Sequence, residues 1–174
     1  MARGRFILLE GCDRAGKSTQ CSMLVSALKA RGHAVELCKF PDRTTTIGKM
    51  IHAYLTNAQE LDDKAGLDLT WCKNPDRGLI RPDVTFFLDL PTSEAERRGG
   101  FGEERYEKRE LQEKVRDVFL KLQSKEWVMI DACKSVEAMH HEILKEAEHK
   151  IQVAEADAKL AEEDDVLVED MFQD

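Results

Sequence analysis

The residue types best suited to chemistry lie together near the amino terminus, in the run G-C-D-R-A-G-K-S from Gly11 to Ser18. Its glycines let the backbone curl so that successive amide N–H groups converge on a phosphate, and the amino end of a following helix adds a positive dipole. Lys17 would reach the β and γ phosphates, and the hydroxyl of Ser18 would bind Mg²⁺. The run matches G-x-x-x-x-G-K-S/T and predicts a nucleoside triphosphate site.

Two further side chains of this loop admit alternative interpretations. Arg14 is not required to hold phosphate, so its guanidinium either follows charge as it develops on a transferred group or is an ordinary surface arginine. Cys12 is interpreted as a small, inert filler residue, with an oxidation-sensitive loop as the alternative.

The chain around this loop shows strand and helix patterns in alternation. The apolar run Phe6 to Leu9 enters the loop as a buried parallel strand should, and a helix with its apolar face at Cys21, Leu24, Val25 and Leu28 leaves it, closed by Gly32. Further strands are predicted at 34–40, 84–90 and 127–130, and further helices around 47–55, over 111–122 and after Ser135. Such alternation predicts an α/β fold with three layers, in which helices cover both faces of a parallel sheet.

Charge and composition exclude several classes of protein. The net charge is −8, but nine acidic residues and one lysine fall within 155–174, so the body is neutral and offers no basic surface for nucleic acid. The five cysteines include no C-x-x-C pair, which favours a reducing compartment, and no apolar stretch is long enough for a signal peptide or a membrane span. We therefore predict a cytoplasmic protein, with nuclear or mitochondrial pools as alternatives, and one domain at 1–154.

The acidic end of the chain, residues 155–174, is predicted to be a flexible tail because it combines like charge with little apolar content. Its few apolar residues, Val166, Leu167, Met171 and Phe172, leave a short docking segment as the alternative.

Five sequence blocks, in order, closely resemble the thymidylate kinases of eukaryotes. They are I-L-L-E-G-C-D-R-A-G-K-S-T-Q, K-F-P-D-R-T-T-T-I-G-K-M-I, W-C-K-N-P-D-R-G-L-I-R-P-D-V, R-G-G-F-G-E-E-R-Y-E and D-A-C-K-S-V-E, and they cover most of positions 5 to 140. The resemblance implies a P-loop kinase that uses Mg²⁺ and ATP to convert dTMP to dTDP for dTTP synthesis. It also implies a homodimer formed through helices beside the sheet.

The resemblance assigns roles to individual residues. Arg14 and Lys17 would be catalytic, Asp13 would hold the deoxyribose 3′-hydroxyl, Arg43 the phosphate of dTMP, and Tyr106 would lie near its sugar. The implied ATP-binding residues are Gly11, Asp13, Arg14, Ala15, Gly16, Lys17, Ser18, Thr19, Arg98, Ala132 and Lys134. The implied dTMP-binding residues are Asp13, Phe40, Arg43, Tyr106 and Gln112, with Ser18 as the metal ligand.

Some of these residues have other plausible roles. Phe40 fits equally well as the last core residue of a strand. The arginines of the implied lid over ATP, Arg97, Arg98 and Arg105, fit an ordinary solvated run of charge.

One unit of the resembled family has no counterpart in this chain. Family members carry a helix with a thymine-stacking Phe and a phosphate-binding Arg, then a strand ending in Asp-Arg-Tyr or Asp-Arg-His. Here the sequence passes directly through 58–68, as if about forty residues, one αβ unit, were missing. Without that central strand, we predict that Ala34 to Phe40 pairs directly with Arg5 to Leu9.

The missing unit predicts weaker function on the acceptor side. Lost stacking and lost arginine contacts would weaken dTMP binding by several kcal/mol, at about 1–3 kcal/mol each, while ATP binding would survive. The chain is then an impaired thymidylate kinase or a noncatalytic ATP-binding variant, and dimerisation becomes doubtful because the missing unit includes part of the dimer surface.

Two other functions remain as alternatives. A GTPase-like switch would need an N-K-x-D motif, which the sequence lacks. A uridylate or cytidylate kinase is also possible, but Arg14, the F-P-D-R segment and Tyr106 favour thymidylate.

Overall fold

The computed structural model describes residues 4–40, 42, 44–46, 48–49, 74, 77–98 and 109–170, with side chains up to residue 156. Its elements in chain order are β1 (Ile7–Glu10), α1 (Lys17–Ala30), β2 (Val84–Asp89), α4 (Thr92–Arg97), α5 (Arg109–Leu122), β3 (Trp127–Asp131) and α6 (Val136–Asp170). Three of the four predicted strands and the helices predicted after the loop, over 111–122 and after Ser135 are therefore confirmed.

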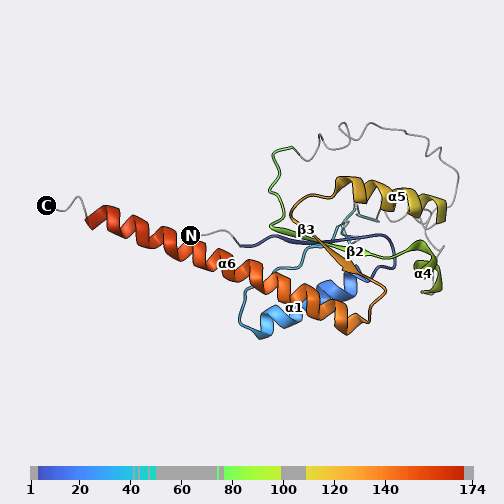
Figure 1. Ribbon diagram of the computed structural model, residues 1–174, viewed down its shortest axis with the longest axis horizontal. Coiled ribbons are helices and arrows are strands. Elements are labelled where there is room, and N and C mark those ends of the chain that lie inside the picture. Colours follow the sequence, from blue (N-terminus) through green and yellow to red (C-terminus); the bar gives the residue numbers. More distant parts are fainter. Residues whose placement is uncertain are drawn as a thin grey trace.

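The three strands form one parallel sheet in the order β1-β2-β3, with Ile7 opposite Val84 and Phe87 opposite Met129. Helices α1 and α6 lie together on one face and α5 lies on the other, so the molecule has three layers (Figure 1). This confirms the predicted α/β fold. The carboxyl ends of all three strands point to one edge of the sheet, where ligands bind in folds of this kind.

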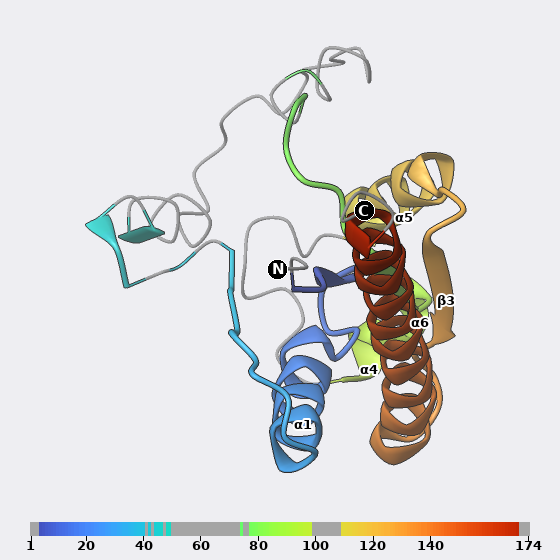
Figure 2. The same ribbon diagram turned by 90° about the vertical axis from the view of Figure 1, so that its left-hand side faces the viewer.

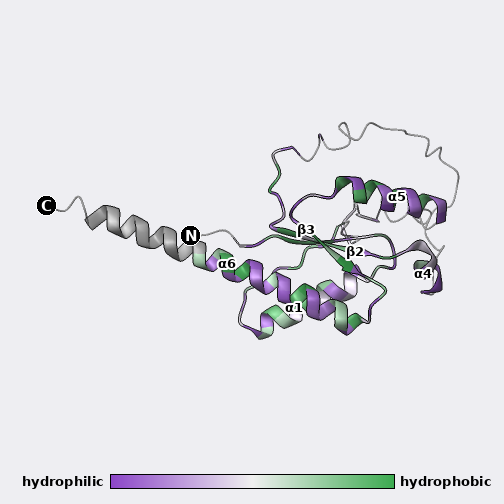
Figure 3. Cartoon of the chain, viewed as in Figure 1, coloured by the Kyte–Doolittle hydropathy of each residue, from purple (hydrophilic) through white to green (hydrophobic). Residues whose placement is uncertain are grey.

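The core lies between the sheet and the α1–α6 layer. Strand β2 is central, and Val84, Phe86 and Leu88 are completely buried because helices or strands surround them on every side. Apolar residues of α1 and α6 complete this core: Leu24, Leu28, Met139, Ile143 and Ala147. Figure 3 shows the resulting concentration of hydrophobic residues on the strands. A central parallel strand of this kind reads as a continuous apolar run, which is why the sequence predicts it well.

The opposite face of the sheet holds α5 through aromatic rings. The ring of Phe87 lies 5.3 Å from that of Phe119 on α5 and 5.5 Å from that of Trp127 on β3. Contacts of this kind add about 0.5–1.5 kcal/mol each beyond their buried area. The last turns of α5 are therefore anchored on the sheet by apolar packing.

The predicted strand at 34–40 is wrong. This segment has no strand hydrogen bonding, Leu37 is 40% exposed and Phe40 is 95% exposed. Figure 2 shows it leaving α1 and running separately from the sheet. Among the residues that the structure describes, β1 pairs with β2 only. The physical reason is that a strand gains its stability from a neighbour, and no described strand lies between β1 and this segment.

Helix α6 begins as predicted but continues further. Ser135 caps it, since its Oγ accepts a hydrogen bond of 3.1 Å from the amide of Ala138. The helix runs on to Asp170, so it includes most of the residues expected to form the acidic tail. Its last turns project beyond the sheet in Figure 1. The flexibility of the tail, and the domain boundary at 154, stay predictions.

No helix in the described ranges combines the length and the apolar content that crossing a membrane would require.

A partly buried histidine of α6, His140, makes stability depend on pH. The Nδ1 atom of His140 is buried without a hydrogen-bond partner in the described part of the chain, and burial lowers its pKa below the usual 6.5, with Arg31 and His141 adding to the effect. As the pH falls through 6.5 the unfolded state takes up this proton before the folded state does. The stabilisation from keeping His140 neutral is therefore complete above that pH and is lost as the pH falls below it.

We expect His140→Gln to lose less of its free energy of unfolding than the parent between about pH 7.5 and about pH 5.5. Urea denaturation at both pH values measures this difference, and the carboxylates common to both proteins cancel. Equal losses in the two proteins would show that His140 is not the group responsible.

Candidate active site

The loop from Gly11 to Gly16 joins the carboxyl end of β1 to the start of α1. Three of its residues have positive φ: Gly11 at 145°, Arg14 at 63° and Gly16, the cap of α1, at 96°. The amide of Ala15 donates to the carbonyl of Cys12 at 3.3 Å and closes the turn. Arg14 has a left-handed conformation that costs a residue with a side chain about 1 kcal/mol or more. Backbone strain of this kind is concentrated at functional sites.

Gly11 permits a close backbone approach. A Cβ atom built at this position would lie 2.6 Å from the carbonyl oxygen of Leu88 on β2, which is closer than real atoms come. A side chain is therefore excluded here by its neighbour as well as by φ.

Lys17, the first residue of α1, folds back over the loop. Its Nζ donates to the carbonyl oxygens of Gly11 at 2.7 Å and Cys12 at 3.0 Å. The same cation opposes the effect of burial on Glu10, whose pKa is nevertheless raised because desolvation is the larger effect. The ammonium group is thus held at the centre of the curled backbone, which suits it to bind a phosphate chain.

Ser18 and Thr19 follow on the first turn of α1, and both are exposed. No group of three or more His, Cys, Asp or Glu side chains gathers to hold a metal in the residues that the structure covers. A hydroxyl at the mouth of a phosphate loop suits Mg²⁺, which keeps several waters and takes the rest of its ligands from substrate phosphates. The residues present therefore fit a metal that arrives with the triphosphate.

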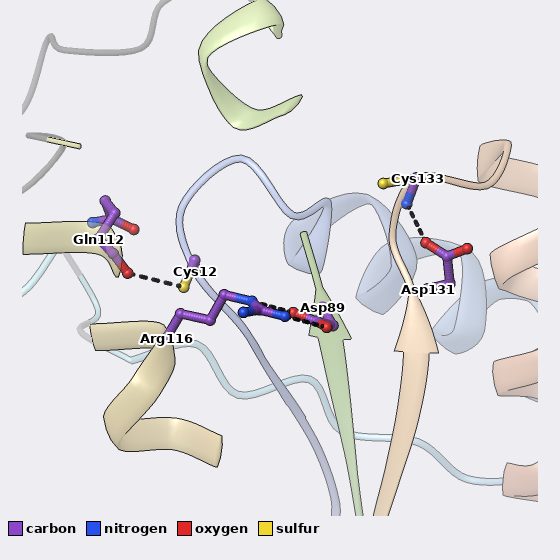
Figure 4. A network of polar contacts seen from close by, with 6 residues as sticks. All are labelled: Cys12, Asp89, Gln112, Arg116, Asp131 and Cys133. Carbon is purple, nitrogen blue, oxygen red and sulfur yellow. Dashed lines mark hydrogen bonds and ion pairs between the residues drawn. The ribbon is translucent and has the colours of Figure 1, made fainter. Parts of the chain in front are cut away.

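Asp13 and Gln112 contact each other across 99 positions of sequence. The Nε2 of Gln112 donates to Oδ2 of Asp13 at 3.0 Å, and the amide of Asp13 donates to Oε1 of Gln112 at 3.3 Å. The thiol of Cys12 donates to the backbone carbonyl of Gln112 at 3.9 Å (Figure 4). The structure thus brings α5 onto the phosphate loop at the two residues assigned to the deoxynucleoside.

Arg98 links two other predicted segments. Its guanidinium donates to the carbonyl oxygen of Arg14 at 2.9 Å and also to that of Ala132. The phosphate loop and the loop after β3 are therefore held together by one side chain. This contact favours a site role for Arg98 over the solvated alternative, whereas Arg97 forms a surface ion pair with Glu94 at 2.7 Å.

Several predicted site residues do not join the contacts around the phosphate loop or lie outside the described residues. Lys134 forms an exposed ion pair with Glu142 at 2.6 Å, which raises the pKa of the lysine. Phe40, at 95% exposed, is not a core residue, so that alternative is wrong, and its contact with a nucleoside stays a prediction. Arg43, Arg105 and Tyr106 lie outside the described residues.

Cys12 behaves as a buried thiol. It is 7% exposed, and burial raises the pKa of its thiol despite the nearby charge of Lys17. A protonated, buried thiol reacts slowly, which favours the interpretation of Cys12 as a filler residue.

Sequence reasoning missed an ion pair beside the loop. Arg116 on α5 binds Asp89 at the end of β2 through two hydrogen bonds, Nε to Oδ1 at 2.6 Å and Nη2 to Oδ2 at 2.8 Å (Figure 4). The hydrogen bond to the Asp89 carboxylate is the main cause of the raised pKa of the Arg116 guanidinium. A signal was available, since Asp89 ends an apolar strand and Arg116 follows Gln112 by one helical turn.

Gln20 was also missed. It is completely buried on α1, and its Nε2 donates to the carbonyl of Val136 at 2.8 Å, at the start of α6. This bond links α1 to the start of α6, immediately after the loop that follows β3. The sequence shows only a glutamine one turn after the lysine of the loop, which does not indicate that it is buried.

A family model described as thymidylate kinase matches residues 9–69 and 59–143. The chain is 40% identical to the thymidylate kinase of Schizosaccharomyces pombe, over 82% of this chain and 90% of the relative. It is 37% identical to the human thymidylate kinase, over 87% of this chain and 93% of the relative. A solved thymidylate kinase from Candida albicans superposes with a TM-score of 0.73 at 30% identity, covering 86% and 93% of the two chains.

These alignments bear on the missing unit. The alignment with the human relative extends over 198 positions, more than the 174 residues of this chain, although it includes only 87% of them. It therefore contains residues of the relative that have no counterpart here. The two family matches also overlap over 59–69, which is the pattern that a missing unit near 58–68 would give. The location of that unit stays a prediction.

Proposed function

Because this chain belongs to the thymidylate kinase family, we propose that its phosphate loop binds ATP and that the enzyme transfers the γ-phosphate to dTMP, giving dTDP and ADP. The observation that supports this most strongly is the meeting of Lys17, Arg14 and the Asp13–Gln112 pair at one end of the sheet. A donor site and an acceptor site would share that loop.

On the donor side, the amide groups of the loop and Lys17 would hold the triphosphate. These amides belong to Gly11, Asp13, Arg14, Ala15, Gly16, Ser18 and Thr19. Arg98, Ala132 and Lys134 would lie near the adenine, and the contact of Arg98 with Ala132 supports this.

Magnesium, when bound with ATP, neutralises charge on the phosphates, and Ser18 would hold it. Its exposed hydroxyl at the start of α1 supports this assignment.

On the acceptor side, Asp13 would accept a hydrogen bond from the 3′-hydroxyl, and Gln112 would orient that carboxylate. Arg43, Phe40 and Tyr106 would complete the dTMP site. A phosphate oxygen of dTMP then attacks the γ-phosphorus in line while the bond from γ-phosphorus to the oxygen of ADP breaks. Arg14 and Lys17 stabilise the negative charge on the group between them, and catalysis comes from position and charge.

We further propose that this chain is impaired on the acceptor side and that its dimerisation is weakened. Loss of a stacking aromatic and of arginine contacts removes about 1–3 kcal/mol each from dTMP binding, whereas the donor residues remain. The exposed position of Phe40 supports an incomplete acceptor site. Size-exclusion chromatography with light scattering measures whether the chain forms a dimer.

Separate titrations with Mg-ATP and with dTMP, followed by chromatography of the nucleotide products, test the function. We expect ATP to bind with ordinary family affinity, dTMP to bind more weakly than to the Schizosaccharomyces pombe relative measured in parallel, and dTDP to form slowly. Absence of any affinity for magnesium nucleotides would contradict the kinase. Turnover equal to that of the relative would contradict the impairment, and ATP binding without dTDP would indicate a noncatalytic variant.

A further inference from the structure

Helix α5 reaches the site through three side chains on one face. Gln112, Arg116 and Phe119 follow one another at helical spacing and contact, in turn, the phosphate loop, the end of β2 and the ring of Phe87. The last contact anchors the final turns of the helix by packing. The first two turns, up to Arg116, have the two polar contacts instead.

Arg116 makes the contact that determines where these first two turns lie. Its guanidinium meets the Asp89 carboxylate side-on with two short hydrogen bonds, which fixes both direction and distance. The two side chains are only 31% and 27% exposed, so water competes with them less than at an open surface. Asp89 itself belongs to the most deeply buried strand and so gives a rigid reference point.

Gln112 lies one turn from Arg116, and its amide group meets the Asp13 carboxylate. Amide-to-carboxylate geometry tolerates little displacement, because a hydrogen bond weakens steeply with distance and angle. A shift of α5 along the sheet would therefore break the contact with Asp13 first. Figure 4 shows Arg116 reaching from α5 past Cys12 to Asp89.

We propose that Asp89 and Arg116 are positioning residues of the acceptor site, which hold α5 on β2 so that Gln112 keeps the Asp13 carboxylate in place for the deoxynucleoside. The assignment rests on the proposed function for the identity of the nucleoside. It does not require either residue to touch substrate.

Kinetics of Asp89→Asn, Arg116→Gln and the double variant test this. We expect each single variant to raise KM for dTMP about tenfold and to change KM for ATP less than about twofold, because the donor residues lie on other elements. The double variant should be no worse than either single one, since the two residues act through one contact. The reversed pair, Asp89→Arg with Arg116→Asp, should recover part of the lost affinity.

The matched control is Arg109→Gln. Arg109 is also an arginine of α5 with an ion-paired carboxylate, Glu113 at 3.0 Å, but it is 59% exposed, and within the described ranges its ion pairs join it to α5 and α4 rather than to β2 or the phosphate loop. We expect its KM for dTMP to remain that of the parent.

A second measurement does not depend on the kinase activity. Amide hydrogen exchange over α5 should speed up in the first two turns in Arg116→Gln and remain slow near Phe119. Unchanged exchange, additive losses in the double variant, or equal rises in KM for both substrates would overturn the proposal. Tighter dTMP binding in Asp89→Asn would also overturn it, because it would mean that the released arginine binds the phosphate directly. If the parent chain did not convert dTMP but exchange in Arg116→Gln were faster, the result would contradict the proposed function and not the role of Arg116.

Discussion

Replacing Lys17 with methionine is expected to lower kcat/KM for ATP by about 1,000-fold. The ammonium group of Lys17 is already in place over the loop, 2.7 Å from the carbonyl oxygen of Gly11 and 3.0 Å from that of Cys12. Charge fixed in advance is the most effective kind in catalysis. Methionine keeps the length and the apolar stem of the side chain but supplies no charge.

The folded state should tolerate this change. Lys17 is only partly buried, so water can replace its ammonium at the two carbonyl oxygens, and the melting temperature should move by no more than a few degrees. Lys29→Met is the matched control, because Lys29 is exposed in the last turn of the same helix. Initial rates of dTDP formation and calorimetric titration with Mg-ATP measure the effect. A Lys17→Met protein that kept a tenth of the parent's activity would contradict the role given to this residue.

Replacing Gly11 with alanine is expected to destabilise the fold by about 3–5 kcal/mol, the sum of backbone strain and overpacking. The new Cβ would lie 2.6 Å from the Leu88 carbonyl oxygen, and the φ of 145° is unfavourable for any residue with a side chain. Leu88 is completely buried in the central strand, so the backbone oxygen cannot move aside cheaply. A loss of this size is a large fraction of the stability of an ordinary domain, about 5–15 kcal/mol.

Gly32→Ala separates the two causes of that loss. Gly32 has a φ of 88°, but a Cβ there would have no neighbour within 4 Å. It should cost only about 1 kcal/mol, from the left-handed backbone alone. Urea denaturation of both variants measures the difference. Equal destabilisation would show that the approach of β2 to the loop is looser than the structure has it.

The local features of the fold could be predicted from the sequence, because each depends on residues close together in the chain. The loop between β1 and α1 follows from its glycines and lysine, and β2 follows from the apolar run that a buried parallel strand requires. The start of α6 follows from its Ser135 cap. Its continuation to Asp170 could not be predicted, since the change in composition after Ala154 favoured an irregular tail.

The features that were missed depend on residues far apart in the chain. The segment at 34–40 has the composition of a strand, but strand formation requires a partner that the sequence of the segment does not contain. Asp13 and Gln112 were both assigned roles from the sequence, but their contact with each other was not predicted. It depends on where α5 lies, and Asp89 and Arg116 set that position through residues 27 positions apart.

The left-handed backbone of Arg14 sets stability against activity in this chain. Glycine would adopt the φ of 63° without strain, so Arg14→Gly should raise the free energy of unfolding by up to about 1 kcal/mol while removing the guanidinium that we propose acts on the transferred phosphate. An arginine is thus retained where a more stable residue was available. Selection for thermostability alone would be expected to replace Arg14 first and to yield a robust protein with a silent active site.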